Sequence, residues 1–285
     1  MKLAINGQQL SATHSLPEIL DVFDSLGVKA IEIWPSNLKG GGCAEDDERY
    51  ETRDVTSTAA LLRERGFSVC CVTLGFWAAP LCFARGGARA FEDALKGAVD
   101  AATQLGAGVV NCYSVGLPLS LFGEAVKPAA RYAASKGIVI TLENEAHDES
   151  GWPQNVANLC NNINSSGFGT QYDPCNYYHA GLEPYPAAYN AIREHIRYVH
   201  LKGGCHFTPS LKGAHQGSAM RNSERDFIGY VPLPEAAFNV EAIVRRLKRD
   251  GYQGWVVLEP HVAGTHLLEF YAQEVPYLRA LLEEK

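Results

Sequence analysis

The feature that most constrains the fold is a regular alternation of short apolar runs with longer stretches of helical periodicity. Several runs are apolar with little alternation, for example Ser68-Val69-Cys70-Cys71-Val72. Continuous apolar strands are typical of a parallel sheet that is covered on both faces. The eight expected strands are Lys2–Asn6, Ala30–Trp34, Ser68–Leu74, Val109–Tyr113, Val139–Asn144, Phe168–Asp173, Arg197–Lys202 and Trp255–Pro260.

Helical segments fill the intervals between these strands, and many of them end in glycine. Leu105-Gly106 and Asp250-Gly251 are two examples, and glycine readily adopts the left-handed conformation that follows a last helical turn. Repeated strand, helix and glycine units indicate right-handed crossovers between parallel strands. The expected helices include Leu16–Leu26, Arg89–Leu105, Glu124–Ser135, Trp152–Ile163, Tyr185–His195 and Val240–Asp250.

Eight such units are compatible with an open doubly wound sheet or with a closed barrel. The open fold usually carries a glycine-rich phosphate turn after its first strand, and Asn6-Gly7-Gln8-Gln9 is not such a turn. A barrel also accommodates all 285 residues, since α/β barrels of about 250 residues fold as one domain. We therefore predict an α/β fold, a single (β/α)8 TIM barrel, with residues 1–285 as one domain.

Two connections between the expected elements are long. Residues 35–53 are rich in glycine and acidic residues, which predicts a solvated loop beside the mouth of the barrel. Residues 203–239 show little clear periodicity. Long loops in compact domains are usually functional or disordered, and a loop after a barrel strand lies at the active face. We expect residues 203–239 to be a loop that covers the substrate.

Composition excludes several classes of protein. The net charge is −7. This argues against a positively charged surface that could bind the phosphate backbone of a nucleic acid. The N-terminal residues become polar too soon for a signal peptide, and no run reaches the ~20 apolar residues of a membrane helix. The eight cysteines form no Cys-x-x-Cys pair, so free thiols are favoured over a disulfide framework. We expect a soluble cytoplasmic protein that binds neither nucleic acid nor membrane.

Polar residues end four consecutive strands that should otherwise be apolar. They are Glu143, Asp173, His200 and Glu259, and the carboxyl ends of barrel strands converge on one mouth. Each could be an isolated polar residue with a backbone partner. Three carboxylates placed so close together would repel one another, however, and a cation is the simplest compensation. This set suits Mn²⁺, Mg²⁺, Co²⁺ or Zn²⁺.

The motifs around these residues resemble those of a known family. They are Leu142-Glu143-Asn144, Tyr172-Asp173-Pro174-Cys175-Asn176, Val199-His200-Leu201-Lys202 and Gly251-Tyr252-Gln253-Gly254-Trp255-Val256-Val257-Leu258-Glu259. They look like the motifs of the xylose isomerase-like barrels, a superfamily of sugar isomerases, ketose 3-epimerases, dehydratases and the endonuclease IV group. The resemblance implies that Glu143, Asp173, His200 and Glu259 bind the metal, with Mn²⁺ favoured. The endonuclease branch has a histidine where this chain has Asn176, which disfavours a DNA-repair site.

The resemblance also implies catalytic roles. The two glutamates among the ligands, Glu143 and Glu259, would exchange protons with the substrate. Lys202 is two residues beyond His200 on the same strand, so its ammonium should lie near the metal and could stabilise an oxyanion. His147, four residues after Glu143, is a candidate acid or base, although a solvated loop histidine is an equal alternative.

Further residues are candidates for substrate binding. Glu32 and Trp34 end the second strand with the same facing, although Trp34 could equally be a packed core residue. Asn6, Asn111 and Tyr113 could bind hydroxyl groups, and solvated loop positions are the alternative for several of the others. The complete set of substrate-binding candidates is Glu32, Trp34, Asn176, Glu145, His206 and His261.

These observations favour a divalent-metal-dependent isomerase or epimerase that abstracts a proton next to the carbonyl of a sugar or keto-sugar. The same ligands would also serve a metal-dependent lyase, such as an inosose-type dehydratase or a keto-glycoside cleaving subunit. A non-catalytic barrel subunit is the alternative from another class. The expected partner is a small-molecule carbohydrate, and association through outer helices or long loops is compatible with a homo-oligomer.

Overall fold

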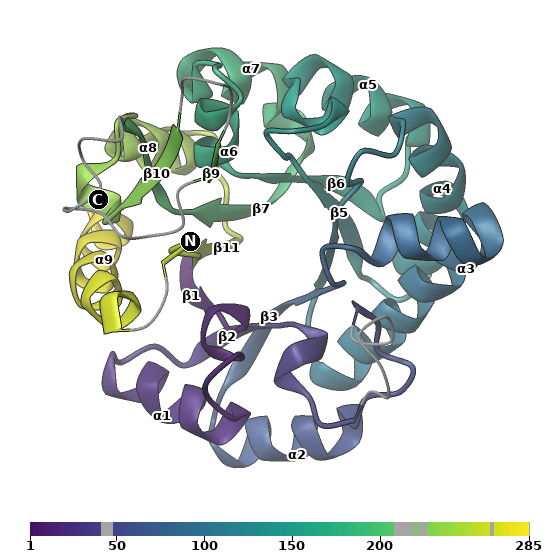
Figure 1. The fold of residues 1–285 in the computed structure, drawn as a ribbon, viewed down its shortest axis with the longest axis horizontal. Helices are drawn as coiled ribbons and strands as arrows, with labels where there is room; N and C mark the ends of the chain where they lie inside the picture. The colour runs from purple at the N-terminus through teal and green to yellow at the C-terminus, as the bar shows by residue number, and fades with distance from the viewer. Residues whose placement is uncertain (41–47, 208–219, 222–226, 263–264, 285) are drawn as a thin grey trace.

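The computed structural model describes residues 1–40, 48–207, 220–221, 227–262 and 265–284. Eight parallel strands form a closed barrel in the order β1-β11-β7-β6-β5-β4-β3-β2 (Figure 1). Strand β1 closes the barrel, because it pairs with β2 on one side and with β11 on the other. The strands are β1 (Lys2–Asn6), β2 (Ala30–Ile33), β3 (Ser68–Thr73), β4 (Val109–Cys112), β5 (Val139–Glu143), β6 (Phe168–Tyr172), β7 (Ile196–Leu201) and β11 (Trp255–Leu258). The predicted TIM barrel is confirmed.

Helices surround the barrel and bury one face each against it (Figure 1). Helix α8 illustrates the pattern, since Val240, Ile243, Val244 and Leu247 are buried and recur at the spacing of one helical face. The described helices are α1 (Leu16–Ser25), α2 (Val55–Glu64), α3 (Ala78–Leu105), α4 (Leu119–Ser135), α5 (Pro153–Ile163), α6 (Pro174–His179), α7 (Tyr189–Ile192), α8 (Val240–Arg249) and α9 (Thr265–Glu283).

Three expected helices differ from the structure. The helix expected at residues 124–135 begins earlier, at Leu119, as α4. The helix expected at residues 89–105 is only the second part of α3, because non-helical conformations at Gly86 and Gly87 divide α3 into two pieces. The helix expected at residues 185–195 is a π-helical turn, the short α7 and a 3-10 turn. Tyr185 has an extended conformation (φ −147°, ψ 129°), because the ring of the following Pro186 disfavours the α region, and this interrupts the helix.

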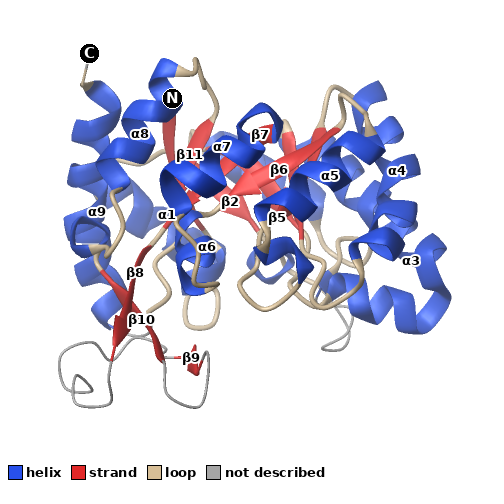
Figure 2. Cartoon of the chain, turned by 90° about the horizontal axis from the view of Figure 1, so that it is seen from above, coloured by secondary structure: helices blue, strands red, loops and turns tan. Residues whose placement is uncertain are grey.

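The connection after β7 contains regular structure that the sequence analysis did not predict. Strands β8 (Gly203–Phe207) and β10 (Phe227–Val231) pair antiparallel, and the short β9 (Met220–Arg221) pairs with β10. Figure 2 shows this small sheet projecting beyond the barrel. Only glycine fits at Gly203, since a Cβ there would lie 2.2 Å from the carbonyl oxygen of Val231. Residues 208–219 and 222–226 of this connection, and 41–47 of the other long connection, lie outside the described residues.

The pleat of the strands explains why polar residues gather at one end of the barrel interior. Small apolar residues and Tyr198 form an interior cluster low in the barrel. Side chains two positions apart on a strand point to the same side. On four strands, the residue two positions after a member of this cluster is polar and therefore points into the barrel as well. The pairs are Ala4 with Asn6, Ala30 with Glu32, Tyr198 with His200, and Val257 with Glu259.

Two further expectations concern the thiols and membrane association. The cysteines among the described residues are free thiols, as predicted, and Cys43 lies outside the described residues. Within the described part of the chain, no helix is both long and apolar enough to cross a membrane.

We predict that Gly167→Ala destabilises the barrel, whereas Gly108→Ala does not. Each glycine precedes a barrel strand, and each carbonyl accepts a hydrogen bond from the neighbouring strand, at 2.9 Å for Gly167 and 3.0 Å for Gly108. A Cβ at Gly167 would lie 2.1 Å from the carbonyl oxygen of Ala130 in α4, while a Cβ at Gly108 would meet nothing within 4 Å. Overpacking of this kind costs about 1–3 kcal/mol. Urea denaturation of both variants measures it, and equal stabilities would contradict the packing argument.

Candidate metal centre

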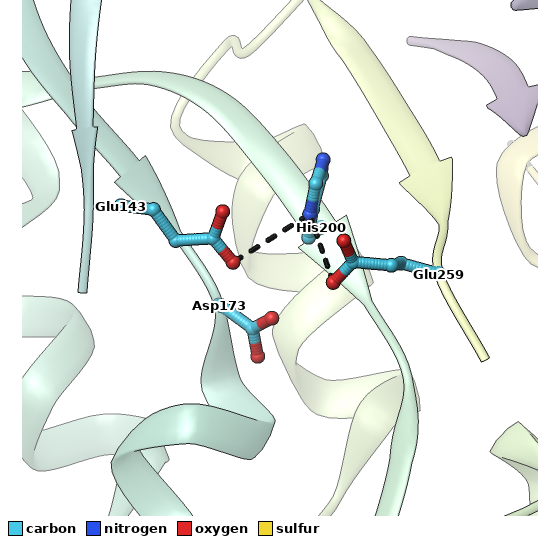
Figure 3. A group of neighbouring side chains, drawn as sticks. All are labelled: Glu143, Asp173, His200 and Glu259. Atoms are coloured by element: carbon cyan, nitrogen blue, oxygen red, sulfur yellow. Dashed lines mark ion pairs between the residues drawn. The ribbon is translucent and has the colours of Figure 1, made fainter. Parts of the chain in front are cut away.

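The four polar strand ends predicted to bind a metal lie together in the barrel (Figure 3). Glu143 ends β5, Asp173 follows β6, His200 lies on β7, and Glu259 follows β11. Their exposed fractions are 3% or less. One nitrogen or oxygen atom from each side chain lies within 4.8 Å of those of the other three. The closed barrel therefore brings together one imidazole and three carboxylates, a donor set that suits a divalent cation.

The imidazole of His200 is held by Glu32 from strand β2. His200 Nε2 lies 2.6 Å from Glu32 Oε2. His200 Nδ1 lies 3.3 Å from Glu259 Oε2 and 3.6 Å from Glu143 Oε1 (Figure 3). It forms no hydrogen bond among the described residues, although it is buried. When Nε2–H donates to Glu32, the lone pair of Nδ1 points at the carboxylates, which is how a metal-binding histidine is oriented.

The carboxylate of Glu32 accepts hydrogen bonds from several neighbouring side chains. The Tyr198 hydroxyl donates to Oε2 at 2.6 Å, and Trp34 Nε1 and Thr73 Oγ1 each donate to Oε1 at 2.8 Å. These donors compensate the burial of an ionised carboxylate. Glu32 was expected to bind substrate, but its side chain is fully buried and does not line the cavity described below. Its position instead supports His200.

Two asparagines orient the glutamates of the cluster. Asn111 Nδ2 donates to Glu143 Oε2 at 3.1 Å, and Asn6 Nδ2 donates to Glu259 Oε1 at 2.8 Å. Each bond uses one carboxylate oxygen, and the other oxygen faces His200 Nδ1. Both asparagines were considered as binders of substrate hydroxyls. In the structure they bind the two glutamates and fix the direction of the remaining oxygens.

Asp173 is positioned by the start of α6 and by the end of β5. Its Oδ1 accepts a hydrogen bond from the backbone N–H of Asn176 at 3.0 Å, the typical bond of an N-cap residue. The Asn144 side chain exchanges two hydrogen bonds with the Asp173 backbone, at 2.9 and 3.0 Å. The Glu143-Asn144 pair thus links two neighbouring strand ends, so the positions of Glu143 and Asp173 are coupled.

Lys202 supplies an internal positive charge to the cluster. Its Nζ lies 2.8 Å from both Asp173 Oδ2 and Glu259 Oε2, and 4.0 Å from Glu143 Oε1. Burial alone would lower the pKa of Lys202, but the charges of Asp173, Glu259 and Glu143 raise it well above its usual value. The side chain is therefore an ammonium and lies beside the candidate ligands, as expected from the sequence.

The charges of the cluster leave room for a cation. Burial would lower the pKa of His200, but the charges of Glu32, Glu259 and Glu143 raise it well above the ordinary value. Without a metal, the cationic Lys202 and His200 therefore face the four buried carboxyl groups of Glu32, Glu143, Asp173 and Glu259, and burial raises the pKa of Asp173. Unbalanced buried charge is costly, and a divalent ion would compensate it. The unpartnered Nδ1 and the oriented carboxylate oxygens fit such an ion.

A cavity of about 340 Å³ lies over this cluster. Nine of the residues predicted from the sequence line it. They are Glu143, Glu259, Lys202, His147, Trp34, Tyr113, Asn176, Glu145 and His261. His206 does not line it; this residue is exposed, and its ring lies 4.7 Å from that of Tyr178.

The cavity wall also contains residues that the sequence analysis did not select. They are Gln8, Gln9, Phe76, Ala146, His179 and Tyr230. Gln8 and Gln9 lie two and three residues after the end of β1, so a search extended slightly beyond the strand ends could have found them. Tyr230 lies in β10, within a connection that showed no periodicity. Its neighbour His179 is buried, and burial followed by the charge of Lys202 lowers the pKa of His179 to about 3.

Glu145 differs from the other carboxyl groups of the cavity. Burial, followed by the charge of Glu143, raises the pKa of Glu145 well above its usual value. Asn176 Nδ2 lies 3.4 Å from Glu145 Oε1. A carboxyl group with a raised pKa can stay protonated near neutral pH and donate a proton. His147 is exposed at the same wall of the cavity.

Comparisons with known proteins identify the family. The sequence matches the model of the xylose isomerase-like TIM barrel family over residues 20–281, and the chain belongs to this family. The resemblance seen in the motifs is thereby confirmed. A search of curated proteins found no match.

Solved structures show the same fold at low sequence identity. A Mycobacterium smegmatis xylose isomerase-like TIM barrel protein in complex with magnesium has a TM-score of 0.72 at 15% identity, with 99% of this chain and 96% of that chain covered. A D-tagatose 3-epimerase-like protein has a TM-score of 0.70 at 16% identity, covering 99% and 97%. The probable 3-DHS dehydratase AsbF from Bacillus anthracis has a TM-score of 0.68 at 14% identity, covering 98% and 99%.

We predict that Glu32→Gln weakens binding of a divalent cation by about 10- to 100-fold, the usual effect of removing a carboxylate behind a ligating histidine. The variant keeps the shape of the side chain but loses the charge that orients His200. Titration calorimetry of the metal-free protein with Mn²⁺ measures the affinity.

Glu274→Gln is the matched control. Glu274 is another fully buried carboxyl group, on α9, where it accepts a hydrogen bond from the Leu233 backbone at 2.9 Å. Burial raises the pKa of Glu274 to about 8, so the neutral amide replaces a largely neutral acid. We expect its Mn²⁺ affinity to match that of the unmodified protein. Equal Mn²⁺ affinities of the two variants would contradict the role that we assign to Glu32.

Proposed function

We propose that the protein is a divalent-metal-dependent isomerase or epimerase that acts on a sugar or keto-sugar by abstracting a proton next to a carbonyl. The observation that carries this proposal is the convergence of Glu143, Asp173, His200 and Glu259 beneath a cavity. The family includes enzymes of this kind, and one structural neighbour is a D-tagatose 3-epimerase-like protein. The cavity is of a size suited to a small molecule.

Each charged residue of the cavity has a proposed role. A divalent ion held by the four ligands would polarise the substrate carbonyl and acidify the adjacent C–H bond. Glu143 and Glu259 both line the cavity, and we assign to them the removal and return of the proton. Lys202 lines the same cavity as an ammonium, so it can stabilise negative charge that develops on the substrate oxygen.

Manganese is the ion that we propose for the site. Three carboxylates and one imidazole suit Mn²⁺, and Mg²⁺, Co²⁺ and Zn²⁺ accept the same ligands. A structural neighbour is in complex with magnesium. Measuring the activity that each of the four ions restores to the metal-free protein ranks the ions as cofactors.

A metal-dependent lyase is the second candidate, and the raised pKa of Glu145 favours it. Glu145 and His147 both line the cavity, so a proton donor is available for a leaving group. An inosose-type dehydratase or a keto-glycoside cleaving subunit would use the same proton abstraction, followed by elimination.

We predict that removing the metal with a chelator lowers activity on a panel of ketoses by about a hundredfold or more, since loss of a charge-stabilising interaction of about 2.7–4 kcal/mol has this effect. Adding Mn²⁺ or Co²⁺ should restore it. Glu143→Gln should remain inactive with added metal, and Glu274→Gln should respond like the unmodified protein. Activity that survives complete metal removal would sink the mechanism.

We further predict that the product has the same mass as the substrate. Isomerisation and epimerisation only relocate hydrogen, whereas elimination divides the substrate into two molecules. Mass spectrometry of the purified product distinguishes the two candidates. A product lighter by one water or by a leaving group would favour the lyase and assign proton donation to Glu145 or His147.

A further inference from the structure

A row of aromatic rings leads from the carboxylate cluster to the surface. Ring centroids lie 5.9 Å apart between Trp34 and Tyr113, 5.1 Å between Tyr113 and Phe76, and 5.2 Å between Phe76 and Trp77. Trp34 is 6% exposed, whereas Trp77 is 55% exposed. We call these four residues the aromatic row. Its rings form a contiguous series from the buried Trp34 to the exposed Trp77.

The two ends of the aromatic row offer carbon surface to a ligand. Trp34 Nε1 already donates to Glu32 at 2.8 Å, so its indole presents ring atoms and no free N–H to the cavity. Trp34, Phe76 and Tyr113 line the cavity. Trp77 is 55% exposed and continues the row onto the surface, where its indole is accessible to a ligand.

The charges of the cavity disfavour an anionic substrate. Among the described residues that line it, Lys202 is the one lysine or arginine. Its ammonium lies 2.8 Å from both Asp173 Oδ2 and Glu259 Oε2, so its charge is shared with these two carboxylates. Glu143 and Glu145 also line the cavity. With a divalent ion at the metal centre, that ion and Lys202 together balance the carboxylates of Glu143, Asp173 and Glu259, so no surplus positive charge is left for a phosphate or carboxylate on the sugar.

We propose that the substrate is an uncharged sugar derivative carrying an apolar, ring-sized group that lies along the aromatic row. Its sugar end faces Glu143 and Glu259, a placement that rests on the function proposed above. The cavity of about 340 Å³ falls in the range of about 300–1,000 Å³ found for ligands of drug size. A sugar with an attached ring fits this size and the division of the cavity into a polar end and an aromatic end.

Calorimetric binding to the Mn²⁺-loaded full chain tests this proposal with three probes. They are phenyl β-D-glucoside, methyl β-D-glucoside and phenyl β-D-glucuronide. The phenyl glucoside should bind about tenfold more tightly than the methyl glucoside, because its ring adds apolar contact. The glucuronide should bind more weakly than the phenyl glucoside, because the carboxylates of the site already balance the positive charges of the ion and Lys202. Absence of either preference, or no binding of the phenyl glucoside, overturns the proposal.

Two tryptophan variants locate the ring. Trp77→Ala should weaken binding of the phenyl glucoside by about two- to tenfold, the range of one aromatic contact, and should leave the methyl glucoside unchanged. Trp152→Ala is the matched control, since Trp152 is 58% exposed and lies outside the aromatic row. It should change neither affinity. Equal effects of both variants on the phenyl glucoside overturn the assignment.

These binding measurements separate the inference from the proposed function. A preference for the phenyl ring that depends on Trp77, found without metal-dependent turnover of any sugar, would support the aromatic subsite and reject the proposed reaction. Metal-dependent turnover of ketoses without that preference would support the reaction and overturn the subsite.

Discussion

The hydrogen bond between Glu32 and His200 is the interaction on which the candidate metal centre depends. Strands β2 and β7 are not neighbours in the barrel, so this bond of 2.6 Å forms only when the barrel closes. It directs His200 Nδ1 towards Glu143 and Glu259. Trp34, Thr73 and Tyr198 donate hydrogen bonds to Glu32, which makes the burial of its charge possible. The closure of the barrel thereby determines the geometry of the site.

The strand pattern predicted much of the fold and of the candidate ligand set. Continuous apolar runs indicate the strands, and the alternation of side chains along a strand indicates which residues face the interior together. The residues after those runs, such as Asp173 and Glu259, must therefore meet at one mouth. Lys202 followed from the same reasoning, because it shares the facing of His200. This reasoning uses only the residues of each strand, so it needed no knowledge of how the strands and helices pack together.

Contacts between separate strands and loops could not be predicted in this way. Glu32 was expected to bind substrate. The direction of a side chain on its own strand does not reveal which side chain lies opposite across the barrel, so its contact with His200 was not predicted. The hairpin of β8 and β10 was missed, since its pairing relies on a close backbone approach at Gly203. The aromatic row joins residues from three connections, and its continuity exists only in the folded chain.

The central claim is that His200 Nδ1 and the three carboxylates bind one divalent ion. Electron paramagnetic resonance of the metal-free protein titrated with Mn²⁺ tests it most directly. The account predicts saturation at one Mn²⁺ per chain, with electron spin echo modulation from a single histidine nitrogen that disappears in His200→Ala. Absence of saturable binding, or an unchanged nitrogen signal in that variant, would contradict the account.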